Sequence, residues 1–128
     1  MAVLGVGTDI VRIDRFRDGI ISPRLIGRVF TAAEIAYCRS KPAPDRHFAA
    51  RFAAKEAAIK ALGAGGICLT ITQVEVVNLE AGGPPHLVLR AGSNRNGLPV
   101  LPDTLRLHVS LSHDGDYALA MVAVEIIG

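Results

Sequence analysis

Two acidic residues and a lysine, far apart in the chain, are the first candidates for chemistry. Asp9 ends an apolar segment, where burying an ionised carboxylate without a partner would be costly. Glu56 and Lys60 are four residues apart, so their side chains share one face if the segment is helical. Two carboxylates that leave room for water and phosphate are typical protein ligands of Mg²⁺. The residue types therefore indicate a magnesium site, although a turn aspartate and a surface Glu–Lys pair explain the same residues.

A serine and two histidines form a second candidate group near the C-terminal end. The alternation over residues 105–111 predicts a strand that places His108 and Ser112 on one face and His113 on the other. His113 enters a turn, where an imidazole can reach a phosphate. Ser112 lacks the G-x-S-x-G turn of serine hydrolases and has no evident base, so nucleophilic catalysis is not expected. For His108 we prefer a local structural contact.

Alanine-rich and capped segments predict two helices that position these residues. The longer is expected over residues 45–62, with its first residue as N-cap and Gly63 as its end. A shorter helix over residues 32–39 follows the capping box of Thr31 and Glu34.

Strand-like segments surround these helices without the strict rhythm of βαβ units, which predicts an α+β fold. Residues 91–102 are rich in glycine, asparagine and proline and are expected to be mostly loop. The expected strands cover residues 2–12, 69–77, 86–89, 105–111 and 117–127.

Composition bounds the class of protein. The 128 residues fit one domain over 1–128, and 50% are hydrophobic. The net charge of +2 and the few aromatic residues argue against a nucleic-acid partner. Cys38 and Cys68 are expected to be reduced thiols. The N-terminal segment lacks a basic region and no stretch is long enough to span a bilayer, so we expect no membrane association and a cytoplasmic location.

Five motifs occur in order along nearly the whole chain. They read GVGTDIV over residues 5–11, FTAAE over 30–34, RFAAKEAAIKAL over 51–62, GPP over 83–85 and HVSLSH over 108–113, with Tyr117-Ala118 after the last. Together they resemble the holo-acyl-carrier-protein synthase family of 4'-phosphopantetheinyl transferases. The central helix and the last motif, at this spacing, are the specific part of the resemblance. The family fold is a small antiparallel sheet packed against a long central helix and shorter helices.

The resemblance implies a role for each candidate. Asp9 and Glu56 would bind Mg²⁺, which bridges the pyrophosphate of coenzyme A, and Lys60 would lie beside the same phosphates. Glu56, or a water that it orients, would be the base when the serine hydroxyl of an acyl carrier protein attacks the β-phosphate and 3',5'-ADP leaves. Other phosphate contacts are expected from Arg51, Ser112 and His113.

The resemblance also implies partners. A homotrimer with active sites between subunits is implied, as is a role in fatty acid biosynthesis, while the resemblance leaves open whether the carrier belongs to fatty acid or polyketide synthesis. Acidic carrier proteins dock after the first strand, where this chain carries Arg15, Arg24 and Arg28; charge alone would favour a solvated basic face. The chain departs from the family in residues 91–102, where glycines and prolines argue against the usual short helix.

Two other functions use the same residues. A metal-dependent phosphohydrolase would use Asp9 and Glu56 to release phosphate from coenzyme A or nucleotides without a protein acceptor. A module that only binds carrier protein or coenzyme A would not depend on magnesium, and it has no need of Glu56 and Lys60 facing a second carboxylate.

Overall fold

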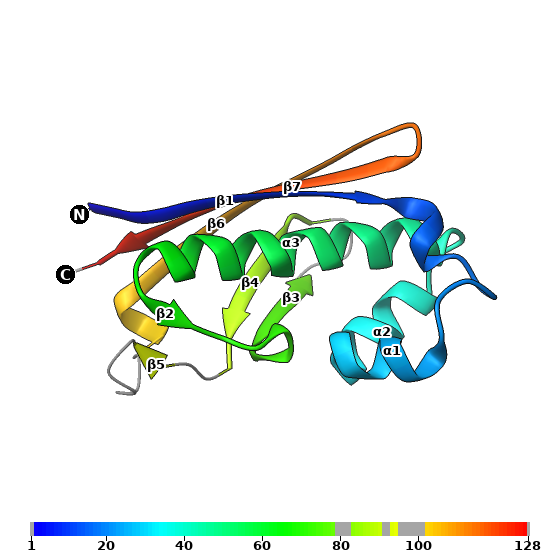
Figure 1. Cartoon of the computed structure of the whole chain (residues 1–128), viewed down its shortest axis with the longest axis horizontal. Helices are drawn as coiled ribbons and strands as arrows, with labels where there is room; N and C mark the ends of the chain where they lie inside the picture. The colour runs from blue at the N-terminus through cyan, green and yellow to red at the C-terminus, as the bar shows by residue number, and fades with distance from the viewer. Residues whose placement is uncertain (1, 79–82, 91–92, 95–101, 128) are drawn as a thin grey trace.

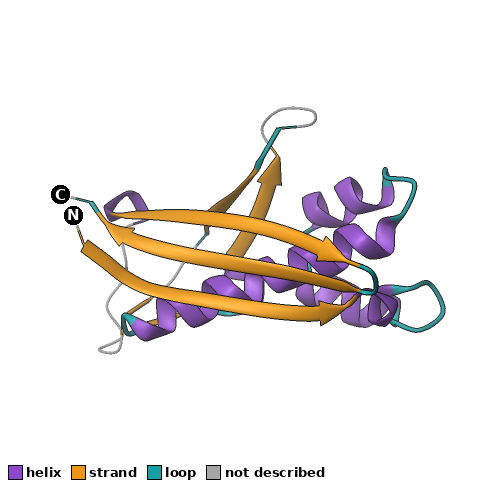
Figure 2. Cartoon of the chain, turned by 90° about the horizontal axis from the view of Figure 1, so that it is seen from above, coloured by secondary structure: helices purple, strands orange, loops and turns teal. Residues whose placement is uncertain are grey.

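One long helix lies under a three-stranded antiparallel sheet in the computed structural model, which describes residues 2–78, 83–90, 93–94 and 102–127 (Figure 1). The strand order is β1-β7-β6, so β1 and β6 are the edges of the sheet (Figure 2). The elements are β1 (Ala2–Arg12), η1 (Ile13–Phe16), α1 (Pro23–Val29), α2 (Ala32–Arg39), α3 (Pro44–Ala64), β2 (Ile67–Cys68), η2 (Ile71–Gln73), β3 (Val74–Asn78), β4 (Pro85–Leu89), β5 (Ser93–Asn94), η3 (Pro102–Thr104), β6 (Leu105–Asp114) and β7 (Tyr117–Ile126).

Small residues let the sheet and α3 approach closely. The inward face of β7 carries Ala118, Ala120, Val122 and Val124, all fully buried, and α3 presents a stripe of buried alanines. On β1 the approach is closer still. A Cβ atom on Gly7 would lie 2.0 Å from the carbonyl oxygen of Ala57, so only glycine allows β1 to rest on the helix backbone.

The ends of α3 differ from the sequence prediction. The helix starts at Pro44, one residue earlier than expected, and no side chain caps it, so the predicted Asp45 N-cap is wrong. Proline suits the first helical position because its φ is preset and it has no N–H to satisfy. The helix also runs through Gly63 and ends at Ala64, with Gly65 as C-cap. A Cβ on Gly65 would collide with the side chain of Leu4 on β1. The helix therefore ends at the point where β1 lies against it.

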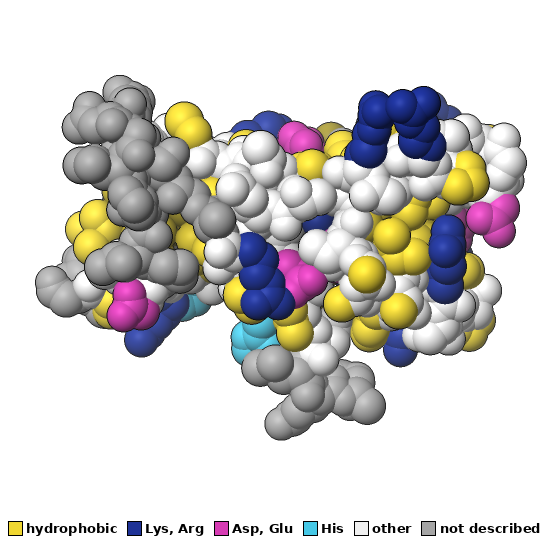
Figure 3. All heavy atoms as spheres, turned by 90° about the horizontal axis from the view of Figure 1, so that it is seen from below, with side chains coloured by type: hydrophobic (Ala, Val, Ile, Leu, Met, Phe, Trp, Pro, Cys, Tyr) yellow, Lys and Arg dark blue, Asp and Glu magenta, His cyan; other side chains and the backbone are white. Residues whose placement is uncertain are grey.

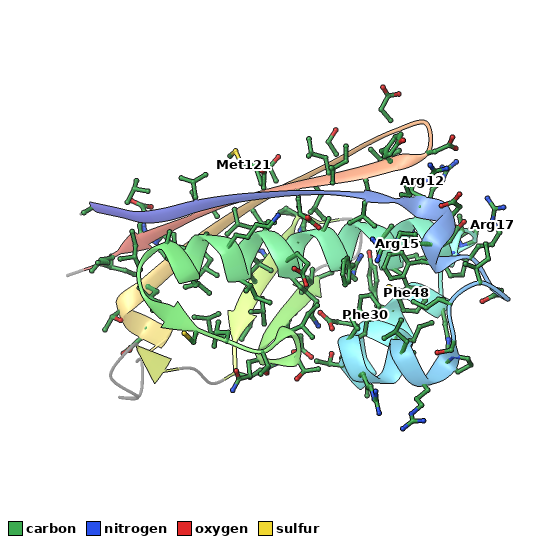
Figure 4. All side chains as sticks on the ribbon, in the orientation of Figure 1. Arg12, Arg15, Arg17, Phe30, Phe48 and Met121 are labelled. Carbon is green, nitrogen blue, oxygen red and sulfur yellow. The ribbon has the colours of Figure 1, made fainter. Side chains whose placement is uncertain are left out.

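A second layer of short helices encloses aromatic side chains against α3. Helix α2 covers the residues predicted for it, and the capping box of Thr31 and Glu34 is present. Phe30 and Phe48 point toward one another between the α1–α2 pair and α3 (Figure 4), with ring centroids 5.0 Å apart. Phe16 packs on Phe30 as well, at 6.0 Å, so this cluster ties the basic segment after β1 to the central helix.

The strands agree with the predicted fold class but not with every boundary. Strand β1 matches residues 2–12, whereas the expected strand over 69–77 divides into the 3₁₀ turn η2 and the shorter β3. The capping box of Thr70 and Gln73 explains this division. Most of the expected loop over 91–102 lies outside the described residues. Among the described residues, no helix combines the length and apolar character needed to cross a bilayer.

Candidate functional site

The packing of β1 on α3 places Asp9 beside the helical turn that carries Glu56. A Cβ on Gly5 would touch the carbonyl of Ala61, and one on Gly7 the carbonyl of Ala57, one helical turn earlier. Two strand residues advance about 6.7 Å and four helical residues about 6 Å, so the two elements stay nearly in step. Asp9 follows on the same strand face, at the level of the turn that precedes and includes Ala57.

Lys60 joins the strand to the helix at this point. Its Nζ lies 3.2 Å from Oδ1 of Asp9 and donates a hydrogen bond of 2.9 Å to the carbonyl oxygen of Thr8. The lysine side chain is 53% exposed and that of Asp9 18% exposed. An ion pair this open to water is weak, so the ammonium is free to turn toward an anion placed beside Asp9.

Glu56 is half-buried and lies one helical turn before Lys60, on the same side of α3. Within the part of the chain that the structure describes, no donor is hydrogen-bonded to its carboxylate, and Asp9 is paired only with Lys60. Two oxygen donors with open positions fit Mg²⁺, which keeps several waters and is commonly bound by one or two carboxylates and substrate phosphates. No group of three or more His, Cys, Asp or Glu residues is found among the described residues, so an all-protein metal cage is not formed there.

Arg51 forms the centre of a separate cavity on α3. The cavity has a volume of about 340 Å³ and is also lined by Ser112 and His113 at the end of β6. Arg51 is only 3% exposed, its guanidinium stacks on the Tyr37 ring at 3.9 Å, and its Nη2 donates to the side-chain oxygen of Asn78. Its Nε is buried and finds no partner among the described residues. An unsatisfied donor on a buried cation is costly, which favours an anionic ligand in this cavity.

Sequence reasoning missed several residues of this cavity. His47 is four residues before Arg51 and therefore shares its helix face, and Arg46 lies beside it. The spacing of two basic side chains was a signal, although it also fits an ordinary solvated face. Tyr37 and Asn78 come from α2 and β3, and nothing in the sequence indicates that they would meet α3 here.

The structure brings the predicted residues together in two groups and does not join the groups within one chain. Asp9 and Lys60 are paired where β1 meets α3, with Glu56 one helical turn before Lys60, whereas Arg51, Ser112 and His113 line the cavity at the end of β6. These strands are the opposite edges of the sheet (Figure 2). On α3, Arg51 and Lys60 are nine residues apart, which at about 100° per residue places them on opposite sides of the helix.

Directly before Glu56, Lys55 makes a buried ion pair that sequence reasoning did not find. Lys55 and Glu34 are both fully buried, with Nζ 2.5 Å from Oε1. The Glu34 carboxylate also accepts hydrogen bonds of 2.8 Å from the backbone N–H groups of Thr31 and Val76. Burial lowers the pKa of Lys55, and the hydrogen bond to Glu34 opposes that shift. This pair links α2, α3 and β3, and so helps to fix the rotation of α3 about its axis.

Comparison with known proteins identifies the family. Residues 5–122 match the family model of the 4'-phosphopantetheinyl transferase superfamily. The holo-[acyl-carrier-protein] synthase of Koribacter versatilis is 42% identical over 127 residues, covering 96% of this chain and 98% of the relative. That of Moorella thermoacetica is 45% identical over 127 residues, covering 96% and 94%.

Solved structures show the same fold. A holo-(acyl-carrier-protein) synthase from Bacillus anthracis in complex with CoA (3',5'-ADP) matches with a TM-score of 0.74 and 26% identity, over 98% of each chain. The acyl carrier protein synthase of Mycobacterium tuberculosis matches with a TM-score of 0.67 and 30% identity, over 98% of this chain and 100% of the other. With the motifs in order, the fold in common and relatives above 40% identity, this chain belongs to the holo-acyl-carrier-protein synthase family of 4'-phosphopantetheinyl transferases.

Proposed function

We propose that this chain transfers the 4'-phosphopantetheine group of coenzyme A to a serine hydroxyl of apo acyl carrier protein, with Asp9 and Glu56 as the ligands of Mg²⁺. The observation that supports the assignment of residues is the contact of Asp9 with Lys60 where β1 rests on α3, one helical turn after Glu56. When bound, the metal supplies positive charge for the pyrophosphate. Phosphoryl transfer depends mainly on such neutralisation and on in-line placement, which suits a site with few polar groups.

Glu56 and Lys60 then have separate roles in the transfer step. Glu56, or a water that it orients, accepts the proton of the carrier serine as its oxygen bonds to the β-phosphorus of coenzyme A. The bond from that phosphorus to the bridging oxygen breaks, and 3',5'-ADP leaves with the electron pair. Lys60, released from Asp9, neutralises the phosphate charge that develops on the leaving group.

We assign Arg51, Ser112 and His113 to further phosphate contacts, supplied by a neighbouring copy of the chain. Support comes from the placement of the two groups at opposite edges of the sheet. A ligand that touches both is easier to accommodate between the β1 edge of one copy and the β6 edge of another.

A homotrimer is part of the proposal. The outer face of the sheet exposes large apolar side chains that a partner subunit would cover, and Met121 points away from α3 on that face (Figure 4). The apolar members of this outer face are Val6, Ile10, Tyr117, Leu119 and Met121.

The carrier protein docks, in this proposal, on the segment from η1 to α1. A groove of about 490 Å³ there has an apolar floor that includes Phe16, Leu25 and Phe52. Figure 3 shows hydrophobic side chains gathered on this part of the surface with basic ones around them. Arg15 lines the groove, and Arg24 and Arg28 come from the exposed side of α1. An acidic helix with an apolar stripe would match both charge and shape. We place the reaction in the cytoplasm, on a carrier of fatty acid biosynthesis.

One assay separates transfer from the alternatives. Apo acyl carrier protein is incubated with the chain, coenzyme A and Mg²⁺, and the carrier is weighed by mass spectrometry. The proposal expects a gain of the phosphopantetheine mass that is lost when the metal is chelated. Degraded coenzyme A with an unmodified carrier would instead identify a phosphohydrolase, and intact coenzyme A with an unmodified carrier a binding module.

A further inference from the structure

The cavity around Arg51 contains a histidine to which the proposed reaction gives no role. His47 faces the cavity from α3 and is half-buried. Its ring meets the Tyr37 ring edge-on, with centroids 5.9 Å apart. Among the described residues, neither ring nitrogen has a hydrogen-bond or ion-pair partner. Both ring nitrogens are therefore available to a ligand.

Positive charge surrounds this histidine. Arg46 and Arg51 come from the same helix, and Lys41 from the connection between α2 and α3, with its Nζ 4.7 Å from the Tyr37 ring. From β6, His113 lines the opposite wall, and Asp45 is the acidic residue that acts on His47. No carboxylate is among the described residues that line the cavity. Such a lining attracts an anion and leaves it without a competing acid.

The same surroundings disfavour the protonated form of His47 while the cavity holds no anion. Burial lowers the pKa of His47, and the charges of Arg51, Lys41 and Arg46 lower it further, against a smaller opposite effect of Asp45. A phosphate beside the ring would reverse the balance, since a nearby opposite charge favours the protonated imidazole. Protonation would also turn the ring nitrogen that had been an acceptor into a second donor.

We propose that His47 is a proton-linked phosphate contact: when a phosphate group of the nucleotide enters the cavity beside Arg51, the imidazole takes a proton from solvent and donates it in a hydrogen bond to a phosphate oxygen. The inference rests on the proposed function only in taking 3',5'-ADP or coenzyme A as the ligand. The direction of the pH dependence of ligand affinity follows from this protonation. Affinity rises as pH falls through the window between the lowered pKa of free His47 and its raised pKa in the complex, and the gain is absent above that window.

The contributions of two other groups have to be separated from that of His47. A phosphate monoester gains a proton with a pKa of about 6, which weakens binding in every variant as the pH falls further. His113 lines the same cavity, so a matched His113→Gln variant is needed beside His47→Gln. Glutamine keeps a polar side chain at each position and removes the imidazole.

The experiment is calorimetric titration of the full chain with 3',5'-ADP between pH 8 and pH 6, in pairs of buffers with different heats of ionisation. The wild type should take up a measurable fraction of a proton per ligand and gain up to about tenfold in affinity on acidification, as a pKa shift of one unit would give. His47→Gln should lose both effects, bind within about threefold of wild type at pH 8, and melt at a similar temperature. His113→Gln should retain part or all of the proton uptake.

Equal proton uptake in wild type and His47→Gln would overturn the inference, and so would uptake lost only in His113→Gln or no binding of 3',5'-ADP by the wild type. A His47→Gln variant that unfolds is replaced by His47→Asn, read in the same way. The proposed function fails separately: a chain that binds 3',5'-ADP with proton uptake but leaves the carrier unmodified keeps the inference and loses transfer. A chain that modifies the carrier without linkage at His47 does the reverse.

Discussion

Lys55 and Glu56 are neighbours in the sequence, yet they face opposite physical environments. Lys55 is fully buried against Glu34, whose carboxylate accepts three hydrogen bonds. Glu56 is half-buried, and among the described residues nothing is bonded to its carboxylate. A buried charge with every partner in place maintains the fold, whereas a reachable carboxylate without partners is available for a cation. On α3, a charged residue that maintains the fold therefore differs from one available for catalysis in whether its hydrogen-bond and ion-pair partners are present, more than in its charge or burial.

The largest effect is expected from Glu56→Gln. The change removes the proposed metal ligand and base, so transfer should fall by about 10³-fold or more, while the melting temperature stays near that of the wild type. Holo-carrier formation is followed by mass spectrometry and folding by circular dichroism. Transfer at the wild-type rate would remove Glu56 from the mechanism.

Next in size is the stability change in Lys55→Met, compared with Lys60→Met on the same helix. Removing Lys55 leaves the Glu34 carboxylate buried without its cation, which should lower the free energy of unfolding by about 3–5 kcal/mol. The pair of Lys60 with Asp9 is exposed, so Lys60→Met should cost at most about 1 kcal/mol while slowing transfer. Urea unfolding measures both. Similar losses in the two variants would contradict the division between Lys55 and the site.

A smaller effect is expected from Gly7→Ala, because the added Cβ would lie 2.0 Å from the carbonyl oxygen of Ala57 and push β1 off the helix. We expect a loss of about 1–3 kcal/mol and slower transfer, since Asp9 moves with the strand. Gly27→Ala in α1 is the matched control, because nothing lies near its added Cβ. That variant should be as stable as wild type or gain up to about 1 kcal/mol. A Gly7→Ala variant as stable and active as Gly27→Ala would disprove the close contact.

The smallest effect concerns the two cysteines, which repeat the contrast between buried and reachable groups. Burial raises the pKa of the Cys38 thiol to about 12, whereas Cys68 is exposed. A thiol reagent at pH 8 should therefore modify Cys68 and leave Cys38 unreacted until the chain is unfolded, because the thiolate is the reactive form. Mass spectrometry of the native and urea-unfolded chain counts the labels. Two labels on the native chain would show that the layer around Cys38 opens.

The sequence was sufficient to predict the α+β class, the first strand and α2, whereas the roles of Asp9, Glu56 and Lys60 stay predictions, of which the structure shows the contact between Asp9 and Lys60. Their local patterns are strong: glycine alternation, a capping box, and two charges one helical turn apart. It could not show that Lys55 is buried or that Arg51 lies beside Ser112 and His113. Those facts depend on how α3 is rotated against β1 and β3, and the contacts that set the rotation join residues distant in the chain.

The cavity around Arg51 was predicted only in part for the same reason. Arg51, Ser112 and His113 came from motifs, whereas Tyr37 is brought in by the packing of α2. His47 has a signal in its four-residue spacing to Arg51, but many solvated helix faces have the same spacing. Both ends of α3 were misplaced because Pro44 and the crossing with Leu4 outweigh the residues that usually cap helices.

The central claim is that Asp9 and Glu56 hold one divalent cation between them. Its most direct test is a titration with Mn²⁺, as a paramagnetic probe of the magnesium site, followed by electron paramagnetic resonance in the presence of coenzyme A. The wild type should bind one Mn²⁺ per chain, displaced by Mg²⁺, and both Asp9→Asn and Glu56→Gln should weaken that binding by at least about tenfold. Unchanged Mn²⁺ binding in either folded variant would contradict the claim.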